Sequence, residues 1–171
     1  MLLERIQFVC SFCSNYDVGP SVIVSNPLAQ EAKTALEDIS KRLAELLGTE
    51  TGYSLAVSKG SGSFPRVPWI GISPLGKRVS NSLSVVTCFA RNGAGIVTGL
   101  MAPAEVTLRA QVQMRSLLKD YLNIDGVSST TRYNDKFINP KDFKIAELDI
   151  DDYLDHLNKS LELMKHLQAT D

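Results

Sequence analysis

LSVVTCFARNGAGIVTGL, residues 83–100, is the stretch that decides the fold. Residues 83–90 form an apolar run that predicts a buried strand, and residues 96–100 form a second run of the same kind. Between them, Asn92-Gly93 is typical of a tight turn, because both residues tolerate positive φ angles. We therefore expect an antiparallel β-hairpin near the centre of the chain.

The residues before this hairpin divide into a helical part and a strand-rich part. Helices are predicted at residues 2–15 and 28–47, where apolar side chains recur at spacings of three and four. The pattern then changes. Residues 53–58 alternate with a period of two and residues 69–72 form another apolar run, which predicts two more strands.

The residues after the hairpin return to a helical pattern. We expect a helix at about 105–122, loop-like residues at 123–143, a short strand at about 143–148 and a final helix to about residue 167. This order predicts an α+β fold, with a central, largely antiparallel sheet of about 4–5 strands flanked by about four helices. The 171 residues suit one domain: a helical preamble at 1–50, the sheet and basic loops at 51–100, and helices with a short strand at 105–168.

The charge is unevenly distributed along the chain. Residues 51–104 carry five bases and no acid, whereas residues 1–50 and 105–171 each have a net charge of −3. The five bases are Lys59, Arg66, Lys77, Arg78 and Arg91. A basic centre between acidic flanks is what a localised anion-binding surface requires, although five bases in such a segment also occur by chance.

The composition argues against a membrane or secreted protein. No apolar run reaches the roughly 18 residues needed to span a bilayer, and the first residues lack the pattern of a signal peptide, so we expect a cytoplasmic protein. Cys10 and Cys13 form a lone C-x-x-C pair, and Cys88 lies in a predicted strand. Without further ligands at close spacing, all three are expected to be buried or semi-buried free thiols and not metal ligands.

Three features resemble catalytic or nucleotide sites only in part. Residues 71–78 approach a phosphate-binding loop but lack the Ser or Thr that should follow its lysine. His156 and His166 lie ten residues apart on the last helix and are expected at the surface. The carboxylates at 149–155 lie at the start of that helix, where negative charges interact favourably with the positive end of the helix dipole. We predict no catalytic residue, no metal and no cofactor.

The remaining candidate site lies between residues 59 and 92, where basic residues alternate with loops rich in Gly and Ser. Small side chains let backbone N–H groups approach a phosphate, and an aromatic ring can stack on a base. Trp69 stands beside these charges, although a single Trp in an apolar strand is more often part of the core. The residues expected to contact DNA are Lys59, Ser61, Ser63, Phe64, Arg66, Lys77, Arg78, Asn81, Arg91 and Asn92.

Within this region, residues 59–72 (KGSGSFPRVPWIGI) carry a family signature. They resemble the G-x-G-x-(F/W)-x-x-(I/V)-P-W motif of the McrB N-terminal domain family, which belongs to modification-dependent, type IV-like restriction systems. Ser80-Asn81, the strand at 83–89 and a returning strand that ends at Gly99-Leu100 follow in the family's order. The order of elements covers most of the chain, but only about 30 residues have specific motif content.

The resemblance implies a domain that binds double-stranded DNA and, in its best-known member, flips a methylated cytosine into a pocket. The pocket positions correspond to Ser61, Trp69, Ser84 and Cys88 here. Where the family has two tyrosines and a leucine, this chain has Ser61, Ser84 and Cys88, and these small side chains cannot stack on a base. Either the pocket accepts a bulkier modified base than 5-methylcytosine, or this protein recognises a site without base flipping.

The resemblance also implies partners. Family members usually continue into a nucleotide-hydrolysing AAA+ motor that works with a separate nuclease subunit, so this chain would be the non-catalytic recognition module of such a restriction system. Two alternatives remain open. The amphipathic helices at 28–47 and 150–167 would suit a protein-interaction or assembly domain of a restriction or defence complex, and the incomplete loop at 71–78 is the one feature favouring a nucleotide-binding enzyme.

Overall fold

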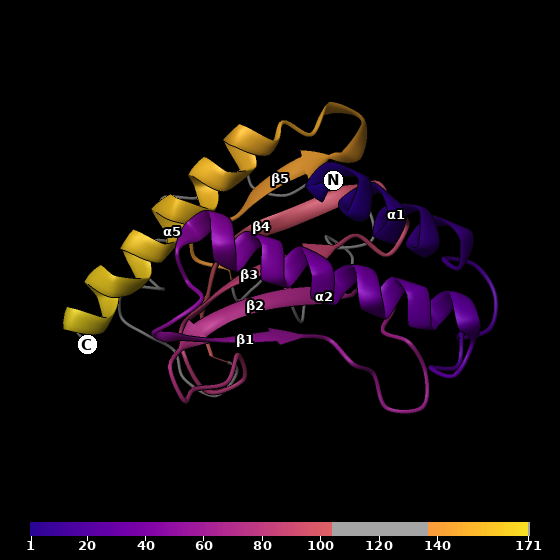
Figure 1. Ribbon diagram of the computed structural model, residues 1–171, viewed down its shortest axis with the longest axis horizontal. Helices are drawn as coiled ribbons and strands as arrows, with labels where there is room; N and C mark the ends of the chain where they lie inside the picture. Colours follow the sequence, from indigo (N-terminus) through magenta and orange to yellow (C-terminus); the bar gives the residue numbers. More distant parts are fainter. Residues whose placement is uncertain (104–136, 171) are drawn as a thin grey trace.

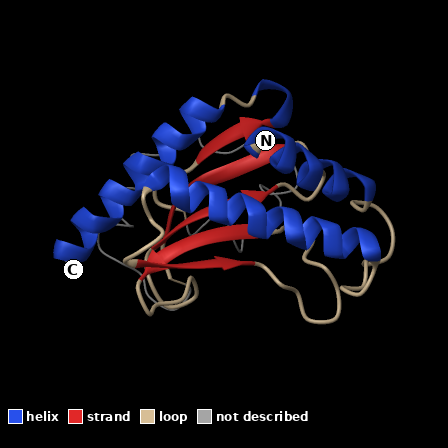
Figure 2. Ribbon diagram, in the orientation of Figure 1, coloured by secondary structure: helices blue, strands red, loops and turns tan. Residues whose placement is uncertain are grey.

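A computed structural model describes residues 1–103 and 137–170, and this part has an α+β fold, as predicted (Figure 2). Its elements in chain order are α1 (Leu2–Asn15), α2 (Pro27–Leu47), β1 (Tyr53–Val57), β2 (Trp69–Pro74), β3 (Ser84–Phe89), β4 (Gly95–Met101), β5 (Lys141–Lys144), the 3-10 helix η1 (Ile145–Glu147) and α5 (Ile150–Thr170). The helix predicted at 105–122 lies outside the described residues.

The five strands form one sheet in the order β1-β2-β3-β4-β5, and every neighbouring pair is antiparallel. The expected hairpin is its centre, with Val85 opposite Leu100 and Phe89 opposite Ile96. Gly93 in the hairpin turn has a φ of 75°, and a Cβ at that position would lie 2.1 Å from the carbonyl oxygen of Cys10 in α1. The turn therefore requires glycine, because the helix packs directly on it.

The last strand differs from its predicted position. β5 begins at Lys141, within residues expected to be a loop, and residues 145–147 form η1 and not a continuation of the strand. The strand ends at Lys144, which pairs with Gly95, the first residue of β4, and the Leu148 N–H then bonds to the Ile145 carbonyl in η1. Its pairing partner, and not its own short sequence, sets its bounds.

The α-helices of the described residues, α1, α2 and α5, lie on one face of the sheet (Figure 1). Alternate strand residues point to that face and form the main core with the helices; they include Ile70, Ile72, Val85, Phe89, Ile96 and Leu100. The opposite face carries a smaller buried cluster that consists of Val67, Val86, Cys88, Ala90, Val97, Met101 and Phe137, with Trp69 and Val79 partly buried against it. Both faces of the sheet therefore carry buried apolar residues.

Polar contacts also attach α5 to the sheet. The Tyr153 hydroxyl is fully buried and lies 2.7 Å from the Thr87 hydroxyl, which donates to Thr98. His156 was expected at the surface, and this is wrong: its ring is half-buried, with Nε2 2.8 Å from the carbonyl oxygen of Asn139. Burial lowers the pKa of His156. This contact between α5 and the residues before β5 explains why the His156 ring is half-buried.

The loops that precede and follow β2 lie at opposite ends of the sheet and form two separate regions. We call residues 58–68 and 90–94 the arginine end, because they carry Arg66 and Arg91, and residues 74–82 the basic turn. β2 runs from the arginine end to the basic turn. At about 3.3 Å per residue, its six residues separate the two regions by roughly 17 Å.

Candidate nucleic-acid interface

The basic turn consists of two successive chain reversals. The Lys77 N–H donates to the carbonyl of Pro74 over 2.9 Å, and the Asn81 N–H donates to the carbonyl of Arg78 over 3.1 Å. Gly76, third in the first reversal, has a φ of 78°, which a type II turn requires at that position.

Side chains hold the backbone of the basic turn in place. The Arg78 N–H donates to the Asn81 side-chain oxygen over 3.0 Å, and the Ser82 hydroxyl donates to the Arg78 carbonyl over 2.7 Å. The Gly76 N–H donates to the hydroxyl of Ser54 in β1 over 2.9 Å. The turn that carries the two cations is therefore fixed by the folded chain before any ligand arrives.

The cations of the basic turn are exposed and unpaired. The side chains of Lys77 and Arg78 point to solvent, and neither forms an ion pair with any residue of the described chain. Adjacent cations on a fixed turn are able to bind neighbouring phosphate oxygens, because the backbone loses little further conformational freedom on contact.

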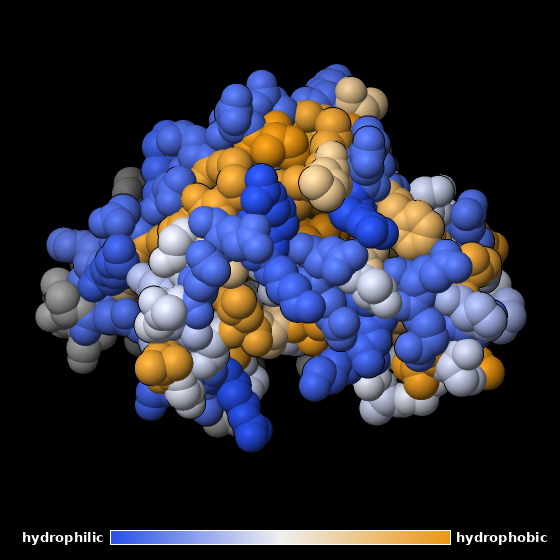
Figure 3. Space-filling view, in the orientation of Figure 1, coloured by the Kyte–Doolittle hydropathy of each residue, from blue (hydrophilic) through white to orange (hydrophobic). Residues whose placement is uncertain are grey.

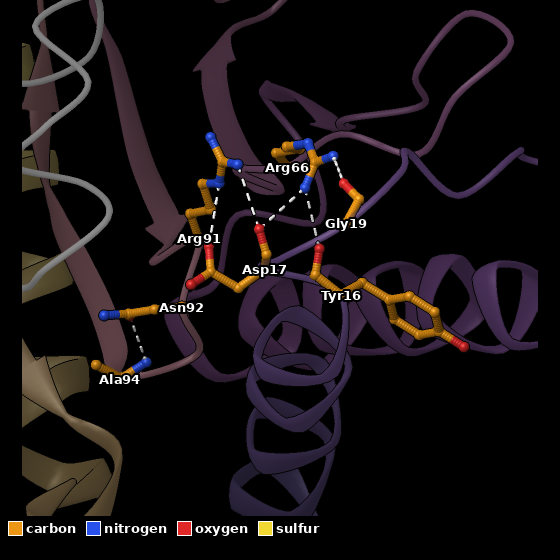
Figure 4. A network of polar contacts seen from close by, with 7 residues as sticks. All are labelled: Tyr16, Asp17, Gly19, Arg66, Arg91, Asn92 and Ala94. Carbon is orange, nitrogen blue, oxygen red and sulfur yellow. Dashed lines mark hydrogen bonds and ion pairs between the residues drawn. The ribbon is translucent and has the colours of Figure 1, made fainter.

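At the arginine end, Arg66 is occupied within the chain (Figure 4). One guanidinium nitrogen donates to the carbonyls of Tyr16 and Asp17 over 3.0 and 3.2 Å, and the other donates to the carbonyl of Gly19 over 2.7 Å. These three carbonyls belong to the segment between α1 and α2, which has no regular ladder of its own to satisfy them. Arg66 thus holds this segment on the sheet.

Arg91 is also occupied. Its Nε–H donates to the Asp17 carboxylate over 3.1 Å, and a terminal nitrogen donates to the Asp17 carbonyl over 3.2 Å (Figure 4). The next residue, Asn92, accepts the Ala94 N–H over 3.0 Å and so shapes the hairpin turn. The ion pair is partly exposed, so its net contribution to stability is small, about 1 kcal/mol or less.

The glycine-rich part of the arginine end is exposed but attached. Lys59, Ser61 and Ser63 are exposed to solvent. The Gly62 carbonyl accepts the Val24 N–H over 3.0 Å, and the Phe64 N–H donates to the Val22 carbonyl over 2.7 Å. The glycine-rich loop therefore packs against the connection between α1 and α2. Lys59 is the one cation of this loop.

Phe64 belongs to the core, since only 6% of its surface is exposed and its ring meets Phe12 edge-on at 4.9 Å between centroids. A hollow beside it is lined by Tyr16, Arg66 and Arg91 among others, but its volume of about 20 Å³ holds one water molecule and not a base. Stacking of a base on Phe64 would need the core to open.

The ten residues expected to contact DNA do not form one continuous face. Lys77, Arg78 and Asn81 lie in the basic turn, whereas the other seven lie in the arginine end, across the length of the sheet. Of the five cations between residues 51 and 104, three are free of ion pairs and of side-chain hydrogen bonds within the described chain: Lys59, Lys77 and Arg78.

Of the four positions expected to form a base pocket, three lie on one face of the sheet and Ser61 lies apart in its loop. Trp69 and Cys88 are cross-strand neighbours, and Ser84 follows on the same face of β3. Ser84 and Cys88 are fully buried, and the Ser84 hydroxyl lies 2.8 Å from that of Ser73. Trp69 is half-buried and Ser61 is exposed in its loop. Only Trp69 and Ser61 therefore present surface to a ligand.

Two residues important to these regions were missed from sequence. Val79 folds over Gly71 beside Trp69: a Cβ at Gly71 would lie 2.5 Å from Val79 Cγ2 and 3.4 Å from the indole. Asp17, 74 residues before Arg91, had no local signal that it would neutralise that arginine. In contrast, the Asn and Ser residues of the basic turn are typical of side-chain-stabilised turns and could have been recognised.

The three cysteines are buried free thiols, as predicted. Burial raises the pKa of each thiol to about 12, so almost none is ionised near neutral pH. The described residues include no group of His, Cys, Asp and Glu side chains able to hold a metal ion. Across the same residues, no helix is long and apolar enough for a transmembrane span.

Comparison with known proteins gives no assignment for this chain. No protein-family model matches it, and no curated protein is similar enough to count as a match.

Proposed function

We propose that the protein is a non-catalytic module that binds double-stranded DNA through the basic turn, in a cytoplasmic McrBC-like restriction system. The observation that carries the proposal is the pair of unpaired cations, Lys77 and Arg78, on a turn fixed by side-chain hydrogen bonds. Phosphate contacts of this kind supply most of the affinity of non-specific DNA binding. In this proposal, Lys59 contributes only long-range attraction from the other end of the sheet.

Trp69 is the residue we propose for base recognition. Val79 connects the basic turn to this tryptophan, so a duplex held by Lys77 and Arg78 would lie close to the indole. Flipping a base costs a few kcal/mol, which stacking on an aromatic ring helps to offset. Because Ser84 and Cys88 are buried, the recognised modified base would stack on Trp69 and not enter a four-walled pocket.

The partners proposed with this function are an AAA+ motor and a nuclease subunit. Neither activity has a candidate site among the described residues, so DNA cleavage would depend on those partners. The proposed contribution of this chain is the choice of target.

A binding panel tests the proposal. Labelled duplexes that differ only in one base, namely cytosine, 5-methylcytosine, 5-hydroxymethylcytosine or N6-methyladenine, are titrated by fluorescence anisotropy at low and moderate salt. We expect binding that weakens steeply with salt, and a preference for one modified duplex that is lost in Trp69→Ala. Equal affinity for all four would remove the modified-base proposal, and no binding at low salt would remove DNA recognition altogether.

A further inference from the structure

Among the described residues β1 is an edge strand, and no strand of the described sheet pairs with its outer main-chain groups. The Ser58 N–H bonds to the carbonyl of Trp69, and antiparallel pairs exchange hydrogen bonds at every second residue. Ser54 and Ala56 therefore bond to β2, whereas the N–H and C=O groups of Tyr53, Leu55 and Val57 point away from the sheet. These groups are ready to pair with another extended strand.

The sequence of β1 does nothing to block such pairing. Proteins usually protect edge strands with proline, charged residues or bulges, but Tyr53–Val57 contains no proline and no charge. Leu55 remains 38% exposed, and Ala56 is exposed as well. Along its outer side no helix or strand of the described chain is drawn (Figure 1), and the surface is hollowed there between two lobes (Figure 3). The edge is open.

Cations stand at both ends of this edge. Lys59 follows β1 by two residues, and the hydrogen bond from Gly76 to Ser54 holds the basic turn beside the start of the strand. Lys59 lies at one end and Lys77 with Arg78 at the other, and none of the three forms an ion pair within the described chain. Near the start of the strand lie also Glu50 and the pair of Lys165 with Glu162, whose lysine is beside Tyr53. Both ends carry an excess of positive charge.

This charge decides which strand fits the edge. A second copy paired antiparallel would bring Lys59 of one chain against Lys77 and Arg78 of the other, and like charges opposite each other are unfavourable. A copy paired in parallel would bring Lys59 against Lys59. A strand with acids at both ends would instead find a cation at each.

We propose that the outer edge of β1 is a docking site for an extended peptide segment of a partner protein, with acidic residues on both sides of a short apolar core. The main-chain groups of Tyr53, Leu55 and Val57 hold the segment by strand addition, which gives affinity without demanding a particular core sequence. The flanking cations select acidic ends. Peptide docking does not require DNA recognition, but the two ligands would compete for Lys77 and Arg78.

The probe is a labelled nine-residue peptide with blocked ends, in which two aspartates on each side flank a core of alternating valine and threonine. Binding to the whole chain is measured by fluorescence anisotropy. We expect Leu55→Pro to weaken binding at least tenfold, because proline removes an outward N–H that β2 does not use. Leu55→Thr keeps that N–H and should bind within threefold of the original protein. In the original chain, the peptide should slow amide exchange at Leu55 and Val57 at least tenfold.

The exchange measurement keeps the test decisive even where Leu55→Pro is poorly folded. The proposal is overturned if the amides of Leu55 and Val57 exchange at unchanged rates in the presence of peptide. It also fails if a lysine-flanked peptide, or an acidic peptide with a glycine-serine core, binds equally well. Protection of the same amides by duplex DNA and not by peptide would mean that DNA binds this edge. A dimer that Leu55→Pro dissociates would mean that a second copy of the chain binds it. Either result would overturn the proposal.

Discussion

The arginine end carries Arg66 and Arg91 in addition to Lys59, and the basic turn carries Lys77 and Arg78 at the opposite end of the same sheet, yet the structure uses the two arginines and the basic-turn pair differently. Arg66 and Arg91 make five hydrogen bonds to the segment between α1 and α2. Lys77 and Arg78 have exposed side chains without such bonds, while the backbone beneath them is fixed. Formal charge is therefore a poor measure of the charge that a ligand can reach.

The largest expected effect is on stability, at the arginine end. Arg66→Ala leaves the carbonyls of Tyr16, Asp17 and Gly19 without their donor, and we expect the free energy of unfolding to fall by about 2–3 kcal/mol. Arg66→Lys should restore little of this stability, because an ammonium group cannot donate to all three carbonyls as the two guanidinium nitrogens do. Urea denaturation measures both. The matched Lys77→Ala should change the free energy of unfolding by less than about 0.5 kcal/mol. Equal losses in Arg66→Ala and Lys77→Ala would contradict the different roles of the two regions.

The second effect is on DNA affinity, at the basic turn. Replacing Lys77 and Arg78 together by alanine should weaken duplex binding by roughly 10–30-fold and lower the slope of log affinity against log salt by about 1.8, for two lost phosphate contacts. Fluorescence anisotropy at several salt concentrations measures both quantities. Lys59→Ala is the control and should stay within threefold. A greater loss of DNA affinity in Lys59→Ala than in the double variant would mean that the phosphate contacts lie at the arginine end and not at the basic turn.

A smaller effect separates turn geometry from charge. Asn81→Ala removes the acceptor of the Arg78 N–H and leaves both cations in place, so we expect about a threefold loss of DNA affinity. Asn92→Ala makes the same change in the hairpin turn, where the amide accepts the Ala94 N–H. Each variant should lose about 1 kcal/mol of stability. Unchanged DNA affinity in Asn81→Ala would mean that the fixed backbone of the basic turn is unimportant.

The smallest effect concerns Cys13, which lines the hollow at the arginine end. Because burial raises its pKa to about 12, alkylation at pH 8 should be slow in the folded protein. Arg66→Ala should speed labelling of Cys13 more than that of Cys88, and mass spectrometry of the peptides would show this. Equal acceleration at both thiols would indicate global unfolding and not local release of the segment between α1 and α2.

The same thiols give a pH dependence. Their pKa values lie near 12 in the folded chain and near 9.0 when unfolded, so the unfolded state loses protons first as pH rises. Stability should be unaffected by these groups below about pH 9 and should fall between about pH 9 and 12. Thermal melts across this range provide the measurement. Replacing Cys88 by alanine should reduce the slope, and an unchanged slope would mean that another group titrates.

Most of the fold could be predicted from the sequence, because its signals are local. The apolar spacing of α1 and α2, the alternation in β1 and the Asn92-Gly93 turn each predicted the observed element. β5 was misplaced because a four-residue edge strand is defined by its partner, β4, and carries little pattern of its own. His156 was expected at the surface because nothing nearby in sequence indicates its contact with Asn139.

The candidate site was harder to predict, because it depends on contacts distant in sequence. Composition identified the basic centre, but the pairing of Arg91 with Asp17 spans 74 residues and neutralises that cation within the chain. Trp69 and Cys88 are cross-strand neighbours on one face of the sheet, yet Ser84 and Cys88 are buried while Trp69 keeps exposed surface, a difference that the packing sets and not the strand pattern. The sequence predicts which residues carry charge, but the packing decides which of them a ligand can touch.

The central claim is that anions bind at the basic turn and not at the arginine end. The most direct measurement is a pair of amide NMR spectra, recorded before and after addition of a short duplex at low salt. We predict that the largest shifts fall on residues 75–82, with small changes at 59–66 and 90–94. Largest shifts at the arginine end, or no shifts anywhere, would contradict the account.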